Sequence, residues 1–305
     1  MISVSDLKFI IALAKNTSLA AAARDLNVSP PAVSQRLASL EDKLALRLVE
    51  RSGRSGILLT SDGELLADRA VNILSDIDSM TSELAERQQK IVGRMRIIAP
   101  FGFGRRYIAA EIAKFRVLHP DVTIDLTLSD NLARLPDSSW DIIIQVSPLE
   151  DSSLIAIQLA PNNRLLCASP TYLENRQLIK TPHDLVNQVC ITLRENDEDD
   201  TLWSFSSADE SIQEQINVRV KSSLSTNDGE TARQWAIEGL GVVQRSEWDV
   251  VDDIRAGRLV HVLPNYKLPH APVAALVASR SNRAVRIQTF LDFIKGALAI
   301  PPWRL

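Results

Sequence analysis

Three consecutive polar residues near the start of the chain carry side chains that can read a nucleic acid. Ser34, Gln35 and Arg36 stand among apolar residues that recur at helical spacing. They are expected on the outer face of a helix, where a hydroxyl, an amide and a guanidinium can hydrogen-bond to base edges in the major groove of DNA. The pattern indicates a DNA-reading helix, and an ordinary helical hairpin is the alternative.

Two helices joined by a tight turn are predicted to position these side chains. Residues 20–23 are all alanine, which favours a first helix with a surface thin enough for close packing. Asn27 tolerates the left-handed conformation expected in the turn. Ser29 is expected to cap the second helix, and Pro30 can occupy its first position without the loss of a hydrogen bond. The predicted buried face of the second helix comprises Val33, Leu37, Leu40 and Leu44.

A preceding helix and a following hairpin complete the predicted head of the molecule, residues 1–60. Residues 47–51 and 56–60 are short extended runs on either side of a turn that contains glycine and arginine, which is typical of a β-hairpin or wing. Arg51 and Arg54 at its tip are positioned for a phosphate backbone, and a surface hairpin with incidental arginines is the alternative. The apolar stripe of the preceding helix comprises Leu7, Ile10, Ile11 and Ala14.

A long helix is predicted over residues 61–92, because this stretch contains no proline and its only glycine, Gly63, lies in the first turn. Ser61 can cap the helix, and Glu64 three residues later would complete a capping box. Its apolar residues step by four and three, which is the heptad pattern of a dimerisation helix, parallel or antiparallel. Packing against the chain's own second domain is the alternative. The seam comprises Leu66, Ala70, Ile73, Ile77, Met80 and Leu84.

Residues 93–305 alternate between predicted strands and helices, which indicates a two-lobed α/β domain with largely parallel sheets. Lobe one is assigned residues 93–163 and 268–305, and lobe two residues 164–267. Two lobes joined by two crossovers form a cleft, where ligands bind. The predicted strands are 95–99, 122–128, 141–146, 164–168, 189–192, 216–220, 242–243, 259–263 and 273–278. The predicted helices include one with Ile108, Ile112, Phe115 and Leu118, one at 229–238 and one with Val285, Phe290, Phe293 and Ile294.

Composition and charge favour a globular protein with one modestly basic part. The 305 residues are 45% hydrophobic and 24% charged, and no apolar run is long enough for a transmembrane helix. The net charge is −4, but residues 1–60 carry +3 and the remainder −7, as suits a head that alone contacts phosphate. The first ten residues do not resemble a secretory signal, and there are only two cysteines. We therefore expect a cytoplasmic protein with no membrane partner.

The chain shows no motif for catalysis, a metal or a cofactor. Its four histidines are scattered, and the acidic run at 195–200 lacks the glycine turn of a calcium loop. Residues 101–104 do not form a dinucleotide fingerprint, because Tyr107 stands at the third glycine position. Two classes remain: a DNA-binding regulator gated by a metabolite, and a two-lobed enzyme or solute-binding protein with a helical extension. The first is favoured, so neither an enzyme nor a bound cofactor is expected.

Over its whole length the chain resembles the LysR-type transcriptional regulators. The specific motifs are Ser-Leu-Ala-Ala-Ala-Ala at 18–23, Val-Ser-Pro-Pro-Ala-Val-Ser at 28–34, Leu40-Glu41, and Leu58 with Thr60 and Gly63. Weaker signals are Ala-Ser-Pro at 168–170 with Tyr172, Asn-Asp-Gly at 227–229, Gly239 with Gly241, and Gly257 with Leu259.

This resemblance implies a winged helix-turn-helix, a dimerising linker helix and a periplasmic-binding-protein-like effector domain. Such proteins are commonly tetramers that bend promoter DNA at an interrupted palindrome, and an activator would also contact RNA polymerase. Carried over by position, the DNA-binding residues are Ser29, Pro30, Pro31, Ser34, Gln35, Arg36, Arg51, Arg54 and Thr60.

The resemblance also implies where an effector binds: the start of the helix after strand 95–99, facing strand 141–146 and lobe two. Pro100 begins a segment where relatives often have serine or threonine, and Gln145 replaces an arginine of many relatives. Arg194 or Arg245 can neutralise a carboxylate, and the free N–H groups at the helix start suit an anion. The expected effector is a small organic acid, an aromatic acid included, whose binding closes the cleft. The candidate residues are Phe101, Gly102, Phe103, Gly104, Ser129, Gln145, Ser147, Thr192, Arg194, Thr226, Asn227, Gln244 and Arg245.

Overall fold

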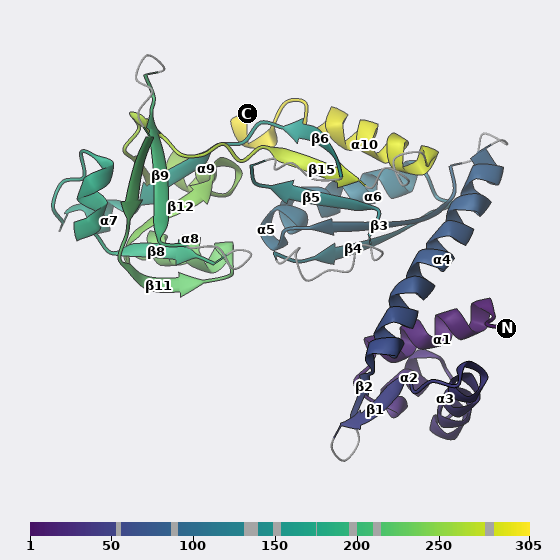
Figure 1. Ribbon diagram of the computed structural model, residues 1–305. Helices are drawn as coiled ribbons and strands as arrows, with labels where there is room; N and C mark the ends of the chain where they lie inside the picture. The colour runs from purple at the N-terminus through teal and green to yellow at the C-terminus, as the bar shows by residue number, and fades with distance from the viewer. Residues whose placement is uncertain are drawn as a thin grey trace. The chain divides into compact units, whose positions relative to one another are not determined.

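Three helices begin the chain in the computed structural model, and the turn between the second and third confirms the predicted motif (Figure 1). Helices α1 (Val4–Lys15), α2 (Leu19–Asp25) and α3 (Pro30–Leu44) belong to a unit of residues Met1–Gly93, and the remaining described residues form a second unit. Asn27 adopts the predicted left-handed conformation, with φ 53°. The structure describes residues 1–52, 56–86, 91–130, 140–148, 154–174, 176–194, 200–209, 215–277 and 284–305.

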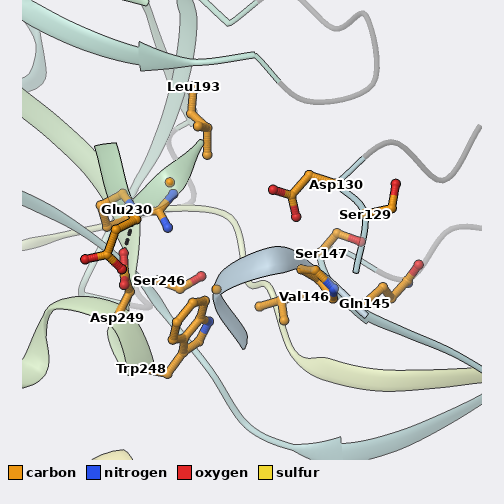
Figure 2. Close-up of a pocket in the computed structure, with 14 residues that line it drawn as sticks. Ser129, Asp130, Gln145, Val146, Ser147, Leu193, Glu230, Ser246, Trp248 and Asp249 are labelled. Carbon is orange, nitrogen blue, oxygen red and sulfur yellow. Dashed lines mark hydrogen bonds and ion pairs between the residues drawn. The ribbon is translucent and has the colours of Figure 1, made fainter. Parts of the chain in front are cut away.

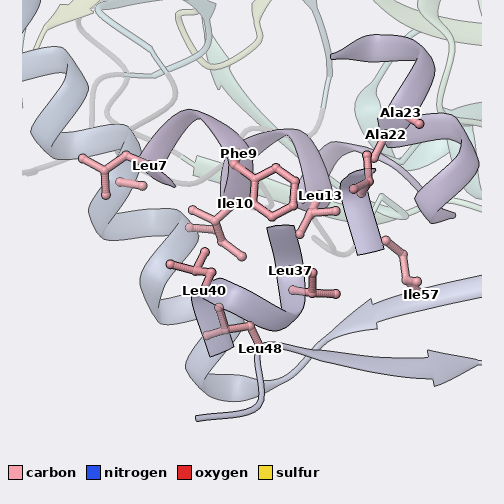
Figure 3. Packing of buried hydrophobic residues seen from close by; sticks show 13 residues of the cluster. Leu7, Phe9, Ile10, Leu13, Ala22, Ala23, Leu37, Leu40, Leu48 and Ile57 are labelled. Carbon is pink, nitrogen blue, oxygen red and sulfur yellow. The ribbon is translucent and has the colours of Figure 1, made fainter. Parts of the chain in front are cut away.

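The hydrophobic core of the head is formed by the three helices together with the hairpin and the start of the long helix, and on α1 it differs from the predicted stripe (Figure 3). Leu7 and Ile10 are buried as predicted, whereas Ala14 is exposed and Ile11 only half-buried. The buried arc of α1 is wider than expected because α2 and the long helix α4 (Ser61–Glu86) both pack against it. The additional buried α1 residues are Phe9, Ala12 and Leu13.

Helix α3 is oriented as the sequence predicts, but its start is capped differently. Pro30 occupies the first helical position, and Val33, Leu37 and Leu40 are buried in the head core. Ser29 stands at the N-cap position, yet its side chain makes no capping hydrogen bond. The prediction that Ser29 caps α3 is therefore wrong. By contrast, Ser18 does cap α2, accepting the N–H of Ala21 at 3.1 Å.

The predicted hairpin is present as β1 (Val49–Ser52) and β2 (Gly56–Leu59), two antiparallel strands. A buried carboxylate fixes where it begins, because Glu41 Oε1 accepts the N–H of Leu48 at 2.8 Å. Burial makes such a bond costly to lose. Glu41 thereby ties α3 to the wing. Residues 53–55, Arg54 among them, lie outside the described residues.

The long helix α4 (Ser61–Glu86) is capped by Thr60 and not by Ser61, which corrects the predicted capping box. The Thr60 hydroxyl accepts the N–H of Gly63 at 3.1 Å and donates to the carbonyl oxygen of Arg47 at 2.7 Å. Residue 63 lies so close to the wing that a Cβ there would be 2.1 Å from the carbonyl oxygen of Leu48. Glycine is therefore required at the join of helix and hairpin.

Lobe one of the second unit is built on a five-stranded sheet in the order β4-β3-β5-β15-β6. Strand β3 is parallel to β5, but β15 is antiparallel to both β5 and β6. The prediction of a largely parallel sheet is wrong because the chain leaves after β6 and returns from lobe two at β15, with no βαβ crossover to impose a parallel direction. The strands are β3 (Gly93–Ala99), β4 (Val122–Leu128), β5 (Ile142–Val146), β6 (Ile155–Ala160) and β15 (Val273–Val277).

One helical stretch follows β3 and another ends the lobe. The first consists of α5 (Phe101–Phe103), a π-helical turn (Gly104–Ile108) and α6 (Ala109–Leu118) in unbroken succession. Of its predicted stripe, Ile108 and Phe115 are buried, Ile112 is half-buried and Leu118 is exposed. Phe115 contacts Phe290 of α10 (Val285–Ala297), with ring centroids 5.1 Å apart. The two helices thus share one apolar layer.

Lobe two has a second five-stranded sheet, in the order β11-β8-β12-β7-β13, and a small sheet in the order β10-β9-β14. Strand β8 is parallel to β11 and β12, whereas β7 is antiparallel to β12 and β13, so this sheet is mixed as well. The strands are β7 (Arg164–Ala168), β8 (Cys190–Leu193), β9 (Leu202–Ser207), β10 (Gln215–Arg219), β11 (Ser222–Thr226), β12 (Val242–Ser246), β13 (Val260–Val262) and β14 (Tyr266–Lys267). The helices are α7 (Pro170–Glu174), a 3₁₀ turn (Pro182–Asn187), α8 (Gly229–Ile237) and α9 (Glu247–Arg255).

Both cysteines lie in lobe two, and both are buried free thiols. Burial raises the pKa of Cys167 and that of Cys190 to about 12. Among the helices that the structure describes, none combines the length and the apolar character needed to cross a bilayer.

Candidate nucleic-acid interface and ligand cleft

The start of α3 offers an exposed polar surface. Ser29, Pro30, Pro31, Ser34 and Gln35 are all exposed, while Val33 between them is fully buried. The Ser34 hydroxyl donates back to the carbonyl oxygen of Pro30 at 3.3 Å, which leaves its oxygen lone pairs facing solvent. This surface therefore presents small residues and one long amide, a combination that admits close approach of a base edge.

Arg36 differs from its neighbours, because its guanidinium is held within the head. Its Nη2 donates to the carbonyl oxygen of Ser5 at 2.7 Å and to the Ser5 hydroxyl at 2.5 Å. The guanidinium carbon also lies 4.7 Å from the centre of the Phe9 ring, in cation–π contact. The expectation that Arg36 lies free on the outer face is corrected: it fastens α3 to α1.

The predicted phosphate-contacting residues are placed only in part. Arg51 belongs to β1, but its side chain is outside the described part of the structure, as is the whole of Arg54. The Thr60 hydroxyl already makes two hydrogen bonds inside the head, so its evident role is to cap α4.

The predicted seam on α4 divides into two parts. Ala70 is fully buried in the head core, and Leu66 packs against that core. Farther along, Ile73, Met80 and Leu84 are 45%, 56% and 59% exposed in the single chain, and Ile77 is half-buried. Among the described residues of the first unit, the later part of the seam is therefore the part that the head core does not cover.

A cavity of about 100 Å³ lies between the two lobes of the second unit (Figure 2). Five of the predicted effector residues line it: Gly102, Ser129, Gln145, Ser147 and Arg245. Gln244 lines an adjoining pocket that shares Val146, Leu193, Arg245 and Ser246 with the first. Pro100, which begins the segment that the sequence indicated, lines the cavity as well. The lining residues that the sequence did not indicate are Asp130, Val146, Leu193, Gly229, Glu230, Ser246, Trp248 and Asp249.

The other predicted effector residues are placed elsewhere by the described part of the structure. Phe101 is 42% exposed, and Gly104 is buried, with Leu128 and Ala99 closest to the position of a Cβ. The Thr192 hydroxyl is 2.7 Å from that of Ser222. Arg194 is exposed and hydrogen-bonds through its backbone to Thr226, and neither these two residues nor Asn227 line the described cleft.

Phe103 is buried in an aromatic cluster behind the cleft and does not line it. Its ring centroid lies 5.4 Å from that of Trp248 and 5.8 Å from that of Trp303, both edge-on. Trp248 itself reaches the cavity, where a Cβ on residue 102 would lie 2.9 Å from its ring. Trp248 lies in the first turn of α9, a short charged helix that the sequence pattern did not predict.

Among the described residues that line the cavity, Arg245 carries the cationic side chain, and two of its neighbours help to fix its position. Its Nε–H donates to Asp249 Oδ2 at 2.8 Å, and the guanidinium lies against the first turn of α8 at Gly229. Arg233 pairs in turn with Asp249 at 3.6 Å and with the buried Asp253 at 2.6 Å. These ion pairs hold Arg245 in a defined direction on the lobe-two side.

The helix start at residue 101 already has an anionic partner, contrary to expectation. Asp130 Oδ1 accepts the N–H of Phe101 at 2.9 Å. Burial raises the pKa of the Asp130 carboxyl above its usual value, and the nearby Arg245 partly offsets this. The helix end therefore stabilises a carboxylate from its own lobe.

Comparisons with known proteins agree with this architecture. Residues 4–64 match the family model "Bacterial regulatory helix-turn-helix protein, lysR family", and residues 88–299 match "LysR substrate binding domain". The HTH-type transcriptional regulator DmlR of Escherichia coli (strain K12) is 33% identical over 296 residues, covering 97% of this chain and 94% of that protein. The HTH-type transcriptional activator TtdR of Escherichia coli (strain UTI89 / UPEC) is 31% identical over 289 residues, 95% of this chain and 91% of that protein.

A solved structure shows the same fold over the full length. The Vibrio cholerae virulence activator AphB, a member of the LTTR protein family, aligns with a TM-score of 0.65 at 24% identity, covering 97% of this chain and 99% of that one. The helix-turn-helix head, the two-lobed domain with its cleft and the two family matches lead to one conclusion. The chain belongs to the LysR family of bacterial transcriptional regulators, as a DNA-binding regulator with an effector-binding domain.

Proposed function

We propose that this regulator reads promoter DNA with the start of α3 and that a small organic acid in the interlobe cleft modulates its binding. The observation that carries the first part is the exposure of Gln35 between the buried Val33 and Leu37. A glutamine side chain can pair with adenine through two hydrogen bonds, which is worth about 1–3 kcal/mol of discrimination. The contacts with the DNA backbone that position α3 in the groove are assigned to the residues around it, Ser29, Pro30, Pro31 and Ser34.

The organic acid is supported by the cleft, where Arg245 is held in place by Asp249. A fixed guanidinium is the group best suited to a carboxylate. The cavity of about 100 Å³ favours a small molecule. Trp248 is the aromatic side chain of its lining, so an aromatic acid would contact Trp248 and not Phe101 or Phe103.

We also propose how copies of the chain assemble, because binding to a palindromic DNA site requires two heads. Head (1–60), linker helix (61–92) and effector domain (93–305) act as separate parts. Pairing through Ile73, Ile77, Met80 and Leu84 would deliver two heads to a palindromic site, and further pairing of dimers would give a tetramer. We place the protein in the cytoplasm, with RNA polymerase as a partner if it activates transcription.

A mobility-shift assay with the purified full-length chain and the DNA upstream of its own coding sequence tests the proposal. We expect a shifted complex that weakens steeply with salt. Gln35→Ala should weaken it, whereas Gln177→Ala, an exposed glutamine in lobe two, should not. Adding carboxylic acids should alter the affinity or the protected region. A protein that ignores every upstream fragment at low salt, with and without acids, contradicts the proposal.

A further inference from the structure

The charged side chains that line the cleft are not complementary to a simple anion. Among the described lining residues, one guanidinium, Arg245, faces three carboxylates: Asp130, Glu230 and Asp249. A dianion such as a plain dicarboxylic acid would be repelled by this set. The ligand must therefore satisfy a carboxylate-rich lining as well as the arginine.

The two lobe-two carboxylates are already neutralised by basic groups of their own lobe. Glu230 forms an ion pair with Arg233, and Asp249 pairs with both Arg233 and Arg245. Asp253 below them pairs with Arg233 at 2.6 Å and with Arg258 at 2.6 Å. In the described part of the structure, the carboxylates Glu230, Asp249 and Asp253 thus already have the guanidiniums of Arg233, Arg245 and Arg258 as partners.

Asp130 is the carboxylate on the lobe-one wall of the cavity, and it takes part in none of these ion pairs. Figure 2 shows its side chain directed into the cleft, opposite Glu230 and Asp249. Its Oδ1 accepts the Phe101 N–H at 2.9 Å, and no basic side chain among the described residues pairs with it within 4 Å. Arg105 and Arg245 are near enough to lower its pKa, yet burial outweighs them. A half-buried carboxylate of this kind gains from a cationic or strongly donating partner.

From this arrangement we infer that the effector is a zwitterion, a free amino acid that bridges the lobes with its carboxylate on Arg245 and its ammonium on Asp130. The inference rests on the proposed function, because it refines the class of acid bound in the same cleft. The inference makes Asp130 a specificity-determining residue. An acid that lacks the amino group keeps the contact with Arg245, but it brings no positive charge to pair with the Asp130 carboxylate. The inference also places the two ends of one small molecule on different lobes.

Matched ligand pairs test the inference on the wild-type full-length protein by isothermal titration calorimetry. The pairs are L-alanine with propionate, L-aspartate with succinate, and L-phenylalanine with 3-phenylpropionate. We expect at least one amino acid to bind about tenfold or more tightly than its deaminated partner, the gain typical of a charge-assisted hydrogen bond. Ethylamine, which lacks the carboxylate, should not bind measurably.

Asp130→Asn separates the charge of this residue from its structural role, because asparagine retains an oxygen for the Phe101 N–H. The variant should bring the two members of the preferred pair to nearly equal affinity, while Asp121→Asn, an exposed carboxylate of lobe one, should leave the preference unchanged. If Asp130→Asn does not fold, the affinities of the matched ligand pairs for the wild-type protein test the inference by themselves. Equal or tighter binding of the deaminated acids overturns the inference and leaves the organic-acid proposal standing. Binding of no acid of either kind overturns both.

Discussion

The guanidinium of Arg245 occupies the space that a side chain on residue 229 would need. A Cβ at Gly229 would lie 2.1 Å from Arg245 Nη2 and 2.6 Å from its guanidinium carbon. Gly229 begins α8 and Arg245 lies in β12, so one glycine allows the cleft arginine to sit against the end of a helix. The glycine of the Asn-Asp-Gly motif at 227–229 is therefore needed in this chain to leave room for the guanidinium of Arg245.

Gly229→Ala is expected to displace Arg245 and to weaken binding of carboxylic acids by about tenfold or more. Calorimetry with the best-binding acid measures the effect. Gly296→Ala is the matched control, because nothing lies within 4 Å of a Cβ there; in α10 it should leave binding unchanged and stabilise the protein by up to about 1 kcal/mol. Unchanged affinity in Gly229→Ala would show that Arg245 does not bind the acid.

Gln35→Ala and Arg36→Ala are expected to separate base reading from head stability. Gln35→Ala should lower affinity for the preferred site by about 5- to 150-fold and flatten its base preference, without a change in melting temperature. Arg36→Ala loses the Ser5 and Phe9 contacts, so it should lower the melting temperature and weaken binding to all sequences alike. Binding to a set of single-base operator variants, with thermal melts, measures both. A sequence-specific defect in a fully stable Arg36→Ala would contradict this assignment.

Glu41→Ala is expected to destabilise the head by about 1–3 kcal/mol, because it leaves the buried N–H of Leu48 without its acceptor. Urea unfolding of the full-length protein should show an earlier head transition, with DNA binding lost in parallel. Asp42→Ala, the exposed neighbour on the same helix, is the control and should change little. Equal stabilities of the two variants would refute the role of Glu41.

Met80→Asp is expected to dissociate the proposed dimer, since it introduces a charge into the apolar seam on α4. Losing burial of one methionine costs about 2 kcal/mol on each helix, before the charge is counted. Sedimentation velocity measures the result. Leu65→Asp changes a residue that is 58% exposed but outside the seam, so that variant should remain a dimer. A dimeric Met80→Asp would place the interface elsewhere.

Neither cysteine is expected to react in the native protein. The pKa values of Cys167 and Cys190, raised from 9.0 to about 12 by burial, leave roughly one thiol in ten thousand ionised at pH 8, and the thiolate is the reactive form. Iodoacetamide followed by mass spectrometry should label both residues only after denaturation. Rapid native labelling would mean that lobe two opens far more readily than its packing implies.

Local residue patterns were sufficient to predict the helices and the hairpin of the head, although not all of their caps and contacts. Alanines, Asn27 and Pro30 act through their own backbone preferences, so the two helices and their turn are found where the sequence predicts them. Several of the elements that were missed are of a different kind. Strand β9 is interrupted by serines, β11 is rich in serine and threonine, and α9 is short and heavily charged. Such segments form regular structure because a neighbouring sheet or an ion-pair network supports them, which a linear pattern does not report.

Helical and strand periodicity are local properties of the chain, so the helix-turn-helix, the heptad helix and the two α/β lobes could be predicted from the residues alone. Which side chains contact one another became known from the folded chain. In the folded chain the guanidinium of Arg36 hydrogen-bonds to Ser5 within the head, and Ala70 is buried in the head core and is not part of the exposed seam. Folding also brings Asp130 into the cleft lining with Arg245, 115 positions along the chain. The physical reason is that contacts, burial and charge pairing depend on distances in space, and those are set by packing between elements.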